Sequence, residues 1–299
     1  MSADAIQLPD LTLHRKALKN AEAAARVIQL SFRRDNWHGQ AGNWAGMGIG
    51  SSIDFQDHRQ YVPGDDPRHI NWQAYARSGH YTMKLYREEV SPQVDLVFDA
   101  SSSMYVTPEK AQRALELLYF ASQSTFQINA QLKAYQIVGD KVKPIAVESL
   151  HSGKLDLIAT AGSVPAVPHF DRVPWRAQSL RVIVSDLLFP SAPEAVVNIL
   201  SGGRMRCLIF CPWAEEEANP NWIGNVELVD CEHDARQTHN LNVNELEAYR
   251  QRYRNHFAVW SDACRRRSID FARVRSTGEL VPALTREALG SQAVEVLGA

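Results

Sequence analysis

The stretch Val94-Asp95-Leu96-Val97-Phe98-Asp99-Ala100-Ser101-Ser102-Ser103 decides the fold class. Its first half is an apolar run of strand length, which predicts a buried β-strand. Directly after it, apolar residues recur at helical spacing, which predicts a helix from about residue 108 to 126. A buried strand feeding a helix is the opening of an α/β domain.

The rest of the chain repeats this alternation. A hairpin is expected from Gln131–Val138 and Lys141–Val147, joined by Gly139-Asp140. The later elements expected are a short helix near 155–161, strands at 180–185, 206–210 and 269–274, and helices within 192–200, 244–266 and 284–297. This order predicts an α/β fold with a doubly wound, mainly parallel sheet covered on both faces.

Composition narrows the function classes. The chain has 299 residues, is 45% hydrophobic and carries a formal net charge of -2, which excludes a generally basic nucleic-acid coat and an acidic disordered tail. No apolar run approaches the roughly 18 to 20 residues that span a bilayer. A membrane span is therefore not expected. The four cysteines lack zinc spacing, which predicts free thiols and a cytoplasmic location.

The first 92 residues read differently from the remainder. An amphipathic helix is expected first, followed by a Gly- and Trp-rich loop from Trp37 to Ser52 that lacks a phosphate-binding Gly-Lys-Ser/Thr. Next comes one short helix, with Asp66 as N-cap, Pro67 in the first turn and Gly79 at its end. We therefore expect two domains, residues 1–92 and 93–299.

Oxygen-bearing side chains gather where two predicted strands end. Asp99, Ser101 and Ser103 follow the first strand, and Asp186 ends the strand at 180–185. Ligands of such sheets collect at carboxyl strand ends, and carboxylate and hydroxyl oxygens suit a small hard cation. The alternative is that both aspartates cap the helices after them and the serines fill turn positions.

Two resemblances bear on that choice. Asp99-x-Ser101-x-Ser103 together with Ser185-Asp186 resembles the metal-ion-dependent adhesion site of von Willebrand factor A domains. The upstream residues make a second likeness, to the bacterial family of unknown function numbered fifty-eight, whose members join this segment to a von Willebrand A-like domain. They are Phe55, Arg59, Tyr61, Pro63-Gly64-Asp65-Asp66, Arg68, Ile70, Trp72, Ala76-Arg77 and Glu88-Glu89.

The second resemblance implies a partner of MoxR-type AAA+ ATPases with chaperone-like assembly work, and it brings no established reaction. Two departures stand out. Asn71 occupies a position where the family usually has aspartate, so one loop charge is lost. The threonine that adhesion sites take from an intervening loop is missing from 164–179, where the nearest candidate upstream is Thr160.

Charge is also unevenly distributed near the carboxyl end. Eight arginines between Arg250 and Arg275 face two aspartates, a local net charge of +6 (eight minus two). The preceding 213–247 segment has nine acidic residues and one arginine, a local net charge of -8 (nine minus one). Intramolecular pairing on solvated helix faces is the favoured explanation; a docking surface and a phosphate-binding face are the alternatives, and no nucleic-acid-binding module accompanies them.

We expect a non-enzymatic protein-interaction module in which Asp99, Ser101, Ser103 and Asp186 hold Mg²⁺, with Mn²⁺ or Ca²⁺ as other options. The expected partners are a MoxR-type ATPase and an unidentified client protein. One alternative is a metal-free scaffold with a degenerate adhesion site. The other is a metal-dependent phosphohydrolase, which is disfavoured because Ser101 stands where a second carboxylate would be needed.

Overall fold

The computed structural model describes residues 8–32, 55–63, 65–86, 92–158, 167–202, 206–231 and 235–297. Its contacts divide the chain into two units, one of Met1–Phe32 with Pro92–Ala299 and one of Arg33–Ser91. We call the first the sheet unit and the second the small unit. The Gly- and Trp-rich stretch from Trp37 to Ser52 and the pair Glu88-Glu89 lie outside the described residues.

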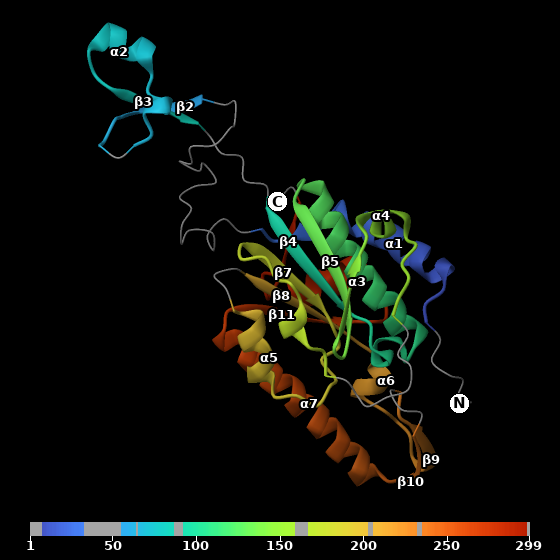
Figure 1. Cartoon of the computed structure of the whole chain (residues 1–299). Helices are drawn as coiled ribbons and strands as arrows, with labels where there is room; N and C mark the ends of the chain where they lie inside the picture. Colours follow the sequence, from blue (N-terminus) through green and yellow to red (C-terminus); the bar gives the residue numbers. More distant parts are fainter. Residues whose placement is uncertain are drawn as a thin grey trace. The chain divides into compact units, whose positions relative to one another are not determined.

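The sheet unit is a mixed α/β structure built on a six-stranded sheet (Figure 1). Its strands lie in the order β11-β8-β7-β4-β5-β6, and all neighbours run parallel except β5 and β6. The strand bounds are β4 Gln93–Asp99, β5 Gln131–Val138, β6 Lys141–Ile145, β7 Ser179–Val184, β8 Cys207–Trp213 and β11 Ile269–Arg275. The predicted doubly wound, mainly parallel sheet is therefore confirmed, and the fold is consistent with a von Willebrand A-like domain.

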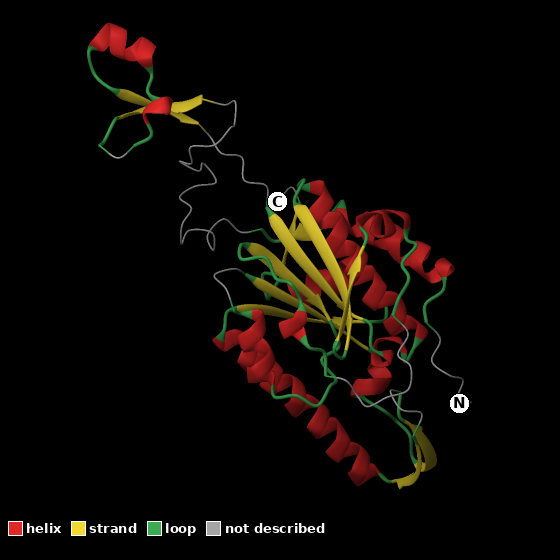
Figure 2. Ribbon diagram, in the orientation of Figure 1, coloured by secondary structure: helices red, strands yellow, loops and turns green. Residues whose placement is uncertain are grey.

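Helices cover both faces of this sheet (Figure 2). The helix bounds are α1 Leu11–Ala25, α3 Pro108–Gln127, α4 Val147–Ser152, α5 Pro193–Leu200, α6 Glu215–Ala218, α7 Val243–Arg266 and α8 Leu280–Ala288, with 3-10 turns at Ser102–Tyr105 and Phe170–Arg172. A two-stranded hairpin, β9 Gly224–Val229 and β10 Arg236–Leu241, precedes α7.

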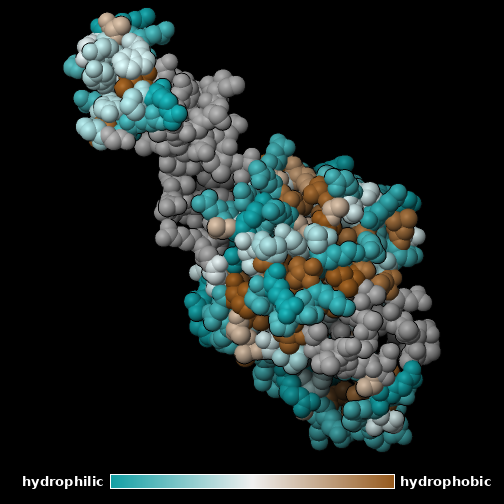
Figure 3. Space-filling view, in the orientation of Figure 1, coloured by the Kyte–Doolittle hydropathy of each residue, from teal (hydrophilic) through white to brown (hydrophobic). Residues whose placement is uncertain are grey.

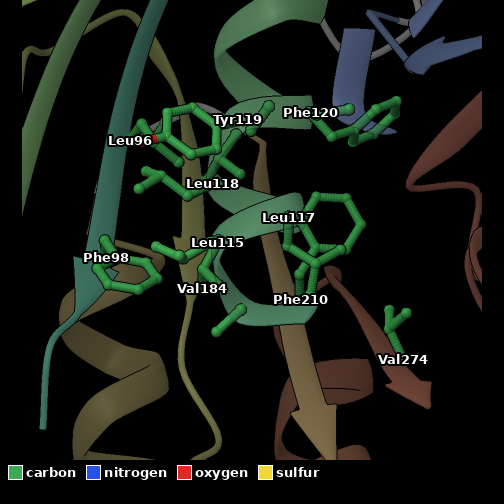
Figure 4. Packing of buried hydrophobic residues seen from close by; sticks show 14 of the residues in the cluster. Leu96, Phe98, Leu115, Leu117, Leu118, Tyr119, Phe120, Val184, Phe210 and Val274 are labelled. Carbon is green, nitrogen blue, oxygen red and sulfur yellow. The ribbon is translucent and has the colours of Figure 1, made fainter. Parts of the chain in front are cut away.

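Alternation along the strands sorts side chains into two cores. Leu96 and Phe98 of β4 face α3, while Val97 faces the core that contains Trp260 of α7. Figure 4 shows Leu115 and Leu118 of α3 packed over these strands. Successive strand residues are buried on opposite faces, which explains why the strands read as continuous apolar runs.

A boundary lies at Ser91/Pro92, next to the expected one, but the first helix belongs to the sheet unit and not to the N-terminal domain in which it was expected. Ala17, Ala21 and Ala24 of α1 are fully buried, and such small side chains let the helix approach its neighbour closely. The Nδ1 atom of His14 lies 2.8 Å from the Tyr119 hydroxyl of α3 in a buried hydrogen bond. The amphipathic pattern was read correctly, but the surface that covers its apolar face lies about 100 residues away in sequence.

The C-terminal region also departs from expectation. Helix α8 ends at Ala288, and the residues after it form β12, Val294–Val296, instead of continuing the helix to 297. Strand β12 pairs antiparallel with β1, Ile28–Leu30. The short helix expected near 155–161 was wrong as well, since α4 lies earlier and residues 154–158 are not helical. Both errors arise because short elements depend on distant partners more than on local pattern.

The small unit contains a hairpin of β2, Phe55–Gln60, and β3, Thr82–Tyr86, with helix α2, Trp72–Ser78, between them. The expected single helix is instead a 3-10 turn, Pro67–His69, capped by Asp66, followed by α2 with its own cap. Asn71 is that cap, its Oδ1 accepting from the Ala74 amide at 3.2 Å. An amide oxygen can cap a helix as well as a carboxylate, so the missing charge leaves this function intact.

Helix α2 ends at a glycine, and aromatic rings cluster beside it. Gly79 adopts a φ of 69°, as the sequence predicted for a left-handed C-terminal residue, and its N–H bonds to the Tyr75 carbonyl. The rings of Tyr75 and Tyr81 stack with centroids 4.5 Å apart, and Trp72 beside them is 58% exposed. The small unit thus carries an aromatic cluster at its surface.

Three of the four cysteines are buried inside the sheet unit. These three, Cys207, Cys211 and Cys264, form no disulfide, and burial raises the pKa of Cys211 and Cys264 to about 12, which keeps those two thiols protonated and unreactive. Polar and apolar residues are intermixed on the face drawn in Figure 3. Among the described residues, no helix is both long and apolar enough to cross a membrane.

Candidate functional site

The two predicted strand ends are neighbours. Strands β4 and β7 run parallel side by side, with Phe98 opposite Val184, so Asp99 and the Ser185-Asp186 pair emerge at the same edge of the sheet. The chain passes from β4 to β5 on one side and later returns to β7 on the other side. Strand order therefore reverses between β4 and β7. The carboxyl ends of the strands at such a reversal are the usual position of a ligand site in these sheets.

Asp99 is completely buried and held by short polar contacts. Its Oδ1 accepts from the Ser101 amide at 3.0 Å, and its Oδ2 accepts from the Ser185 hydroxyl at 2.7 Å. The Ser101 and Ser103 hydroxyl oxygens lie 3.1 Å apart on the loop that follows, and both residues are part-exposed. The structure thus brings Asp99, Ser101 and Ser103 together as predicted.

Asp99 lacks a countercharge. No lysine, arginine or histidine forms an ion pair with it in the described ranges. Burial, and next the negative charge of Asp186, raises the pKa of Asp99 to about 7. The buried hydroxyl of Tyr105, whose pKa is raised by burial and by Asp99, has no hydrogen-bond partner among the described atoms. A cation or a water molecule beside Asp99 would relieve both conditions.

Asp186 has a different environment. Its Oδ1 accepts from the Leu188 amide at 3.0 Å, and its Oδ2 lies 2.8 Å from the ammonium of Lys110 on α3. The same ammonium donates to Oε1 of Glu217 on α6, whose other oxygen accepts from the Ala214 amide at 2.9 Å. The Lys110 side chain is fully buried, so this is an internal ion-pair triad.

The triad fixes the charge of Lys110. Burial alone would lower the pKa of Lys110, but Asp186 and Glu217 together raise it above the ordinary value. Burial raises the pKa of Glu217, and the lysine opposes that change. Counting Asp99 as ionised, the site holds three carboxylates and one ammonium, a formal net charge of -2 (three minus one).

One spacing among the predicted metal ligands can be compared with a cation site, that of the Ser101 and Ser103 hydroxyls, which form a hydrogen bond with each other. Neighbouring ligands of an octahedral Mg²⁺ at about 2.1 Å are about 3.0 Å apart, close to the separation of the Ser101 and Ser103 hydroxyls. Asp99 adds an unneutralised carboxylate. Asp186 differs from Asp99, because its Oδ2 is already paired with the Lys110 ammonium while its Oδ1 accepts from the Leu188 amide.

A cation site here has to use hydroxyls. In the described part of the chain, no three His, Cys, Asp or Glu side chains are placed to hold a metal ion. Thr160, the nearest threonine upstream of β7, lies outside the described residues. The adhesion-site threonine therefore has no counterpart in the parts of the loop that are described, 154–158 and 167–178.

The sequence analysis missed Lys110, Glu217, Ser185 as a hydrogen-bond donor, and Tyr105. A signal for Lys110 does exist in the 3-residue spacing of Lys110, Arg113 and Glu116, all of which are buried. This spacing puts the three on one face of α3. The helix is buried on several sides, including this charged face.

The charged C-terminal segments pair largely within the molecule. Arg254 binds Glu247, Arg266 binds Glu194, and Arg275 binds Glu215, each at 2.7 or 2.8 Å. The guanidinium of Arg273 stacks over Phe257 at 3.8 Å from the ring centroid. The favoured explanation of intramolecular pairing is confirmed for these arginines.

Comparison with known proteins gives one match. The model of a family described as "Protein of unknown function DUF58" matches residues 57–262, which include the small unit's hairpin, Asp99, Lys110, Asp186 and Glu217. Searches of curated proteins and of solved structures found no match. Because the family match spans more than half of the 299 residues, the chain belongs to this DUF58 family.

Proposed function

We propose that the protein is a non-enzymatic adaptor that binds a partner protein at the edge between β4 and β7, with Mg²⁺ or a similar ion held by Asp99, Ser101 and Ser103. The observation that carries the proposal is Asp99, a buried carboxylate without a countercharge beside two part-exposed hydroxyls 3.1 Å apart. Keeping such a group in the fold costs stability, which is typical of a functional site.

The charge balance supports a divalent ion. A formal charge of -2 at the site would be neutralised by one Mg²⁺. Three protein oxygens leave other positions of an octahedral ion open to water or to a carboxylate of the partner. The positive charge of the ion would attract that carboxylate. The ion itself would be held in place by Asp99, Ser101 and Ser103.

The partner we propose is a MoxR-type AAA+ ATPase acting with a client protein in assembly or maturation. This proposal rests on the resemblance described above and on membership of the DUF58 family. A cytoplasmic location would be required for contact with such an ATPase.

The first test is calorimetric titration of the full chain with Mg²⁺ and with Mn²⁺. Binding is expected for the wild type and not for Asp99→Ala. Asp156→Ala is the matched control, because Asp156 is an acidic residue of the same unit in an exposed ion pair with Lys143. Folded wild-type protein that binds neither ion would contradict the metal-assisted mechanism.

A second candidate is a metal-free scaffold. The observation that favours it is the Lys110 ammonium at 2.8 Å from Asp186, because a resident positive charge already neutralises part of the site. The two candidates differ in their response to a chelator. Binding of a purified MoxR-type ATPase, measured by analytical ultracentrifugation, should disappear in EDTA for the metal-assisted adaptor and stay unchanged for the scaffold.

A further inference from the structure

We infer that Lys110 is an internal competitor of the cation: its ammonium holds Asp186, and a metal ion gains Asp186 as a ligand only when Lys110 retreats to Glu217. This inference rests on the proposed function, since it concerns how the same site is loaded. It assigns a role to Lys110 and Glu217, neither of which was predicted as a metal ligand.

The geometry offers Lys110 two alternative acceptors. Its ammonium lies 2.8 Å from Oδ2 of Asp186 and also contacts Oε1 of Glu217. Lys110 approaches from α3, Asp186 follows β7, and Glu217 lies on α6 after β8, so the three come from separate elements. A lysine with two carboxylates can release one and remain paired with the other.

Glu217 is placed to keep the lysine. Its Oε2 accepts from the Ala214 amide, and its backbone carbonyl accepts from the Tyr249 hydroxyl of α7 at 2.9 Å. Asp186 is anchored in a similar way, since its Oδ1 accepts from the Leu188 amide at 3.0 Å and its backbone carbonyl accepts from Cys211 Sγ at 3.3 Å, which leaves Oδ2 to the lysine or to an ion. The two acceptors differ in their neighbour: the charge of Asp186 acts on Asp99, so Asp186 is the carboxylate that an ion beside Asp99 would reach, and Glu217 is the one that remains to the lysine.

Two cations that share one buried carboxylate oxygen repel each other, and this repulsion costs free energy. A divalent ion at Asp99, Ser101 and Ser103 would repel the Lys110 ammonium if that ammonium stayed on Asp186. The lysine therefore lowers metal affinity by an amount that depends on how firmly it holds Asp186. Weakening that hold should strengthen metal binding, and removing Glu217 as the alternative acceptor should weaken it.

The test is calorimetric titration of the full chain with MgCl₂ for four proteins: wild type, Lys110→Met, Glu217→Gln and Lys143→Met. Lys110→Met should lower the Kd by about tenfold or more, the scale of effects from groups next to metal ligands. Glu217→Gln should raise the Kd. Lys143→Met is the control, because Lys143 forms an exposed ion pair with Asp156, and its Kd should equal that of the wild type.

The outcomes separate this inference from the proposed function. A wild type that binds Mg²⁺ with the same Kd as Lys110→Met overturns the inference and leaves the function standing. A wild type that does not bind while Lys110→Met does supports the inference and overturns the metal-assisted function. No binding by either folded protein overturns both.

Lys110→Met leaves two buried carboxylates without their partner, so it could be unfolded in chelator. In that case millimolar Mg²⁺ should restore its circular dichroism spectrum, because the ion would take the place of the ammonium. Failure of Mg²⁺ to restore the spectrum would overturn the inference.

Discussion

Strand β4 carries a buried carboxylate near each end, Asp95 and Asp99, and the two have opposite surroundings. Both side chains are fully buried. Asp95 accepts from Nε of Arg176 at 2.7 Å, from the Arg176 amide at 2.8 Å and from the Ser179 hydroxyl at 2.5 Å. Asp99 accepts from an amide and a hydroxyl but forms no ion pair with any described residue.

The difference separates a structural carboxylate from the one on which the proposed function depends. Arg176 also donates to the carbonyls of Val94 and Gln131, so its pairing with Asp95 ties three chain segments together at the amino edge of the sheet. At the carboxyl edge, the buried ammonium of Lys110 pairs with Asp186 and Glu217, and neither ion pair includes Asp99. Asp95 is neutralised by Arg176 at one end of the strand. At the other end, the charge of Asp99 would be available for an external cation.

The largest effect is expected at the amino end. Arg176→Met leaves Asp95 buried without its countercharge and should lower the free energy of unfolding by about 4 kcal/mol. Urea unfolding followed by circular dichroism measures the change. Arg172→Met is the control, because its ion pair with Asp140 is about half exposed on both sides, and a loss comparable to that of Arg176→Met would refute the structural role of Arg176.

The second effect has the opposite sign. The pKa of Asp99 is about 7 in the folded chain and 3.8 as the ordinary value, so the folded state binds more protons between those pH values. Its stability therefore falls as pH rises from about 4 to about 7, and it stays low above that range. Asp99→Asn removes this penalty and should raise the free energy of unfolding at pH 8 by on the order of 3 kcal/mol in chelator.

At pH 4 the Asp99→Asn protein and the wild type should have nearly equal stability, because Asp99 is protonated in the folded wild type. Urea unfolding at both pH values makes the comparison. A stability difference that is the same at pH 4 and pH 8 would show that Asp99 is not the group responsible.

A smaller loss is expected when Asp99 loses a donor. Ser185→Ala removes the hydroxyl that donates to Asp99 and accepts from the Leu187 amide at 3.1 Å. It should cost about 2 kcal/mol at pH 8, because hydrogen bonds to charged groups are stronger than neutral ones, and about 1 kcal/mol at pH 4. Equal costs at both pH values would argue that the hydroxyl contributes nothing specific to the ionised carboxylate.

The smallest stability effect is expected for the part-exposed hydroxyls. Ser103→Ala should change the free energy of unfolding by less than about 0.5 kcal/mol. In the same protein, Mg²⁺ binding in calorimetric titration should weaken by about tenfold or more if Ser103 is a ligand. Unchanged Mg²⁺ affinity would remove Ser103 from the proposed ligand set.

The sheet and the meeting of Asp99 with Ser185-Asp186 at its carboxyl end could be predicted because their signals are local. The apolar runs of β4 and β7 end in Asp99 and in Ser185-Asp186, and parallel strands bring such ends to one edge. Lys110 could not be predicted in the same way. Its burial depends on where α6 places Glu217, more than 100 residues later, and a lysine in a helix is ordinarily exposed.

The errors at the ends of the chain have the same origin. Nothing in the sequence near β1 points to residues 294–296, and α1 reads as a free amphipathic helix until α3 is present to cover it. Asn71 illustrates the reverse case: a departure from the family pattern suggested a loss, yet the capping hydrogen bond is kept by the amide oxygen. The cap itself was not predicted, since a single helix starting at Asp66 was expected, although the partner amide of Ala74 is only three residues from Asn71.

The pairing of β1 with β12 also has a consequence for the order of synthesis. A ribosome makes Ile28–Leu30 long before Val294–Val296, so β1 has to wait for nearly the whole chain before its backbone amides and carbonyls find their partners. Strands β4 and β5, by contrast, can pair soon after residue 138 emerges. During synthesis β1 therefore has no β12 to pair with until residues 294–296 have been made, and the sheet unit is completed only after that point.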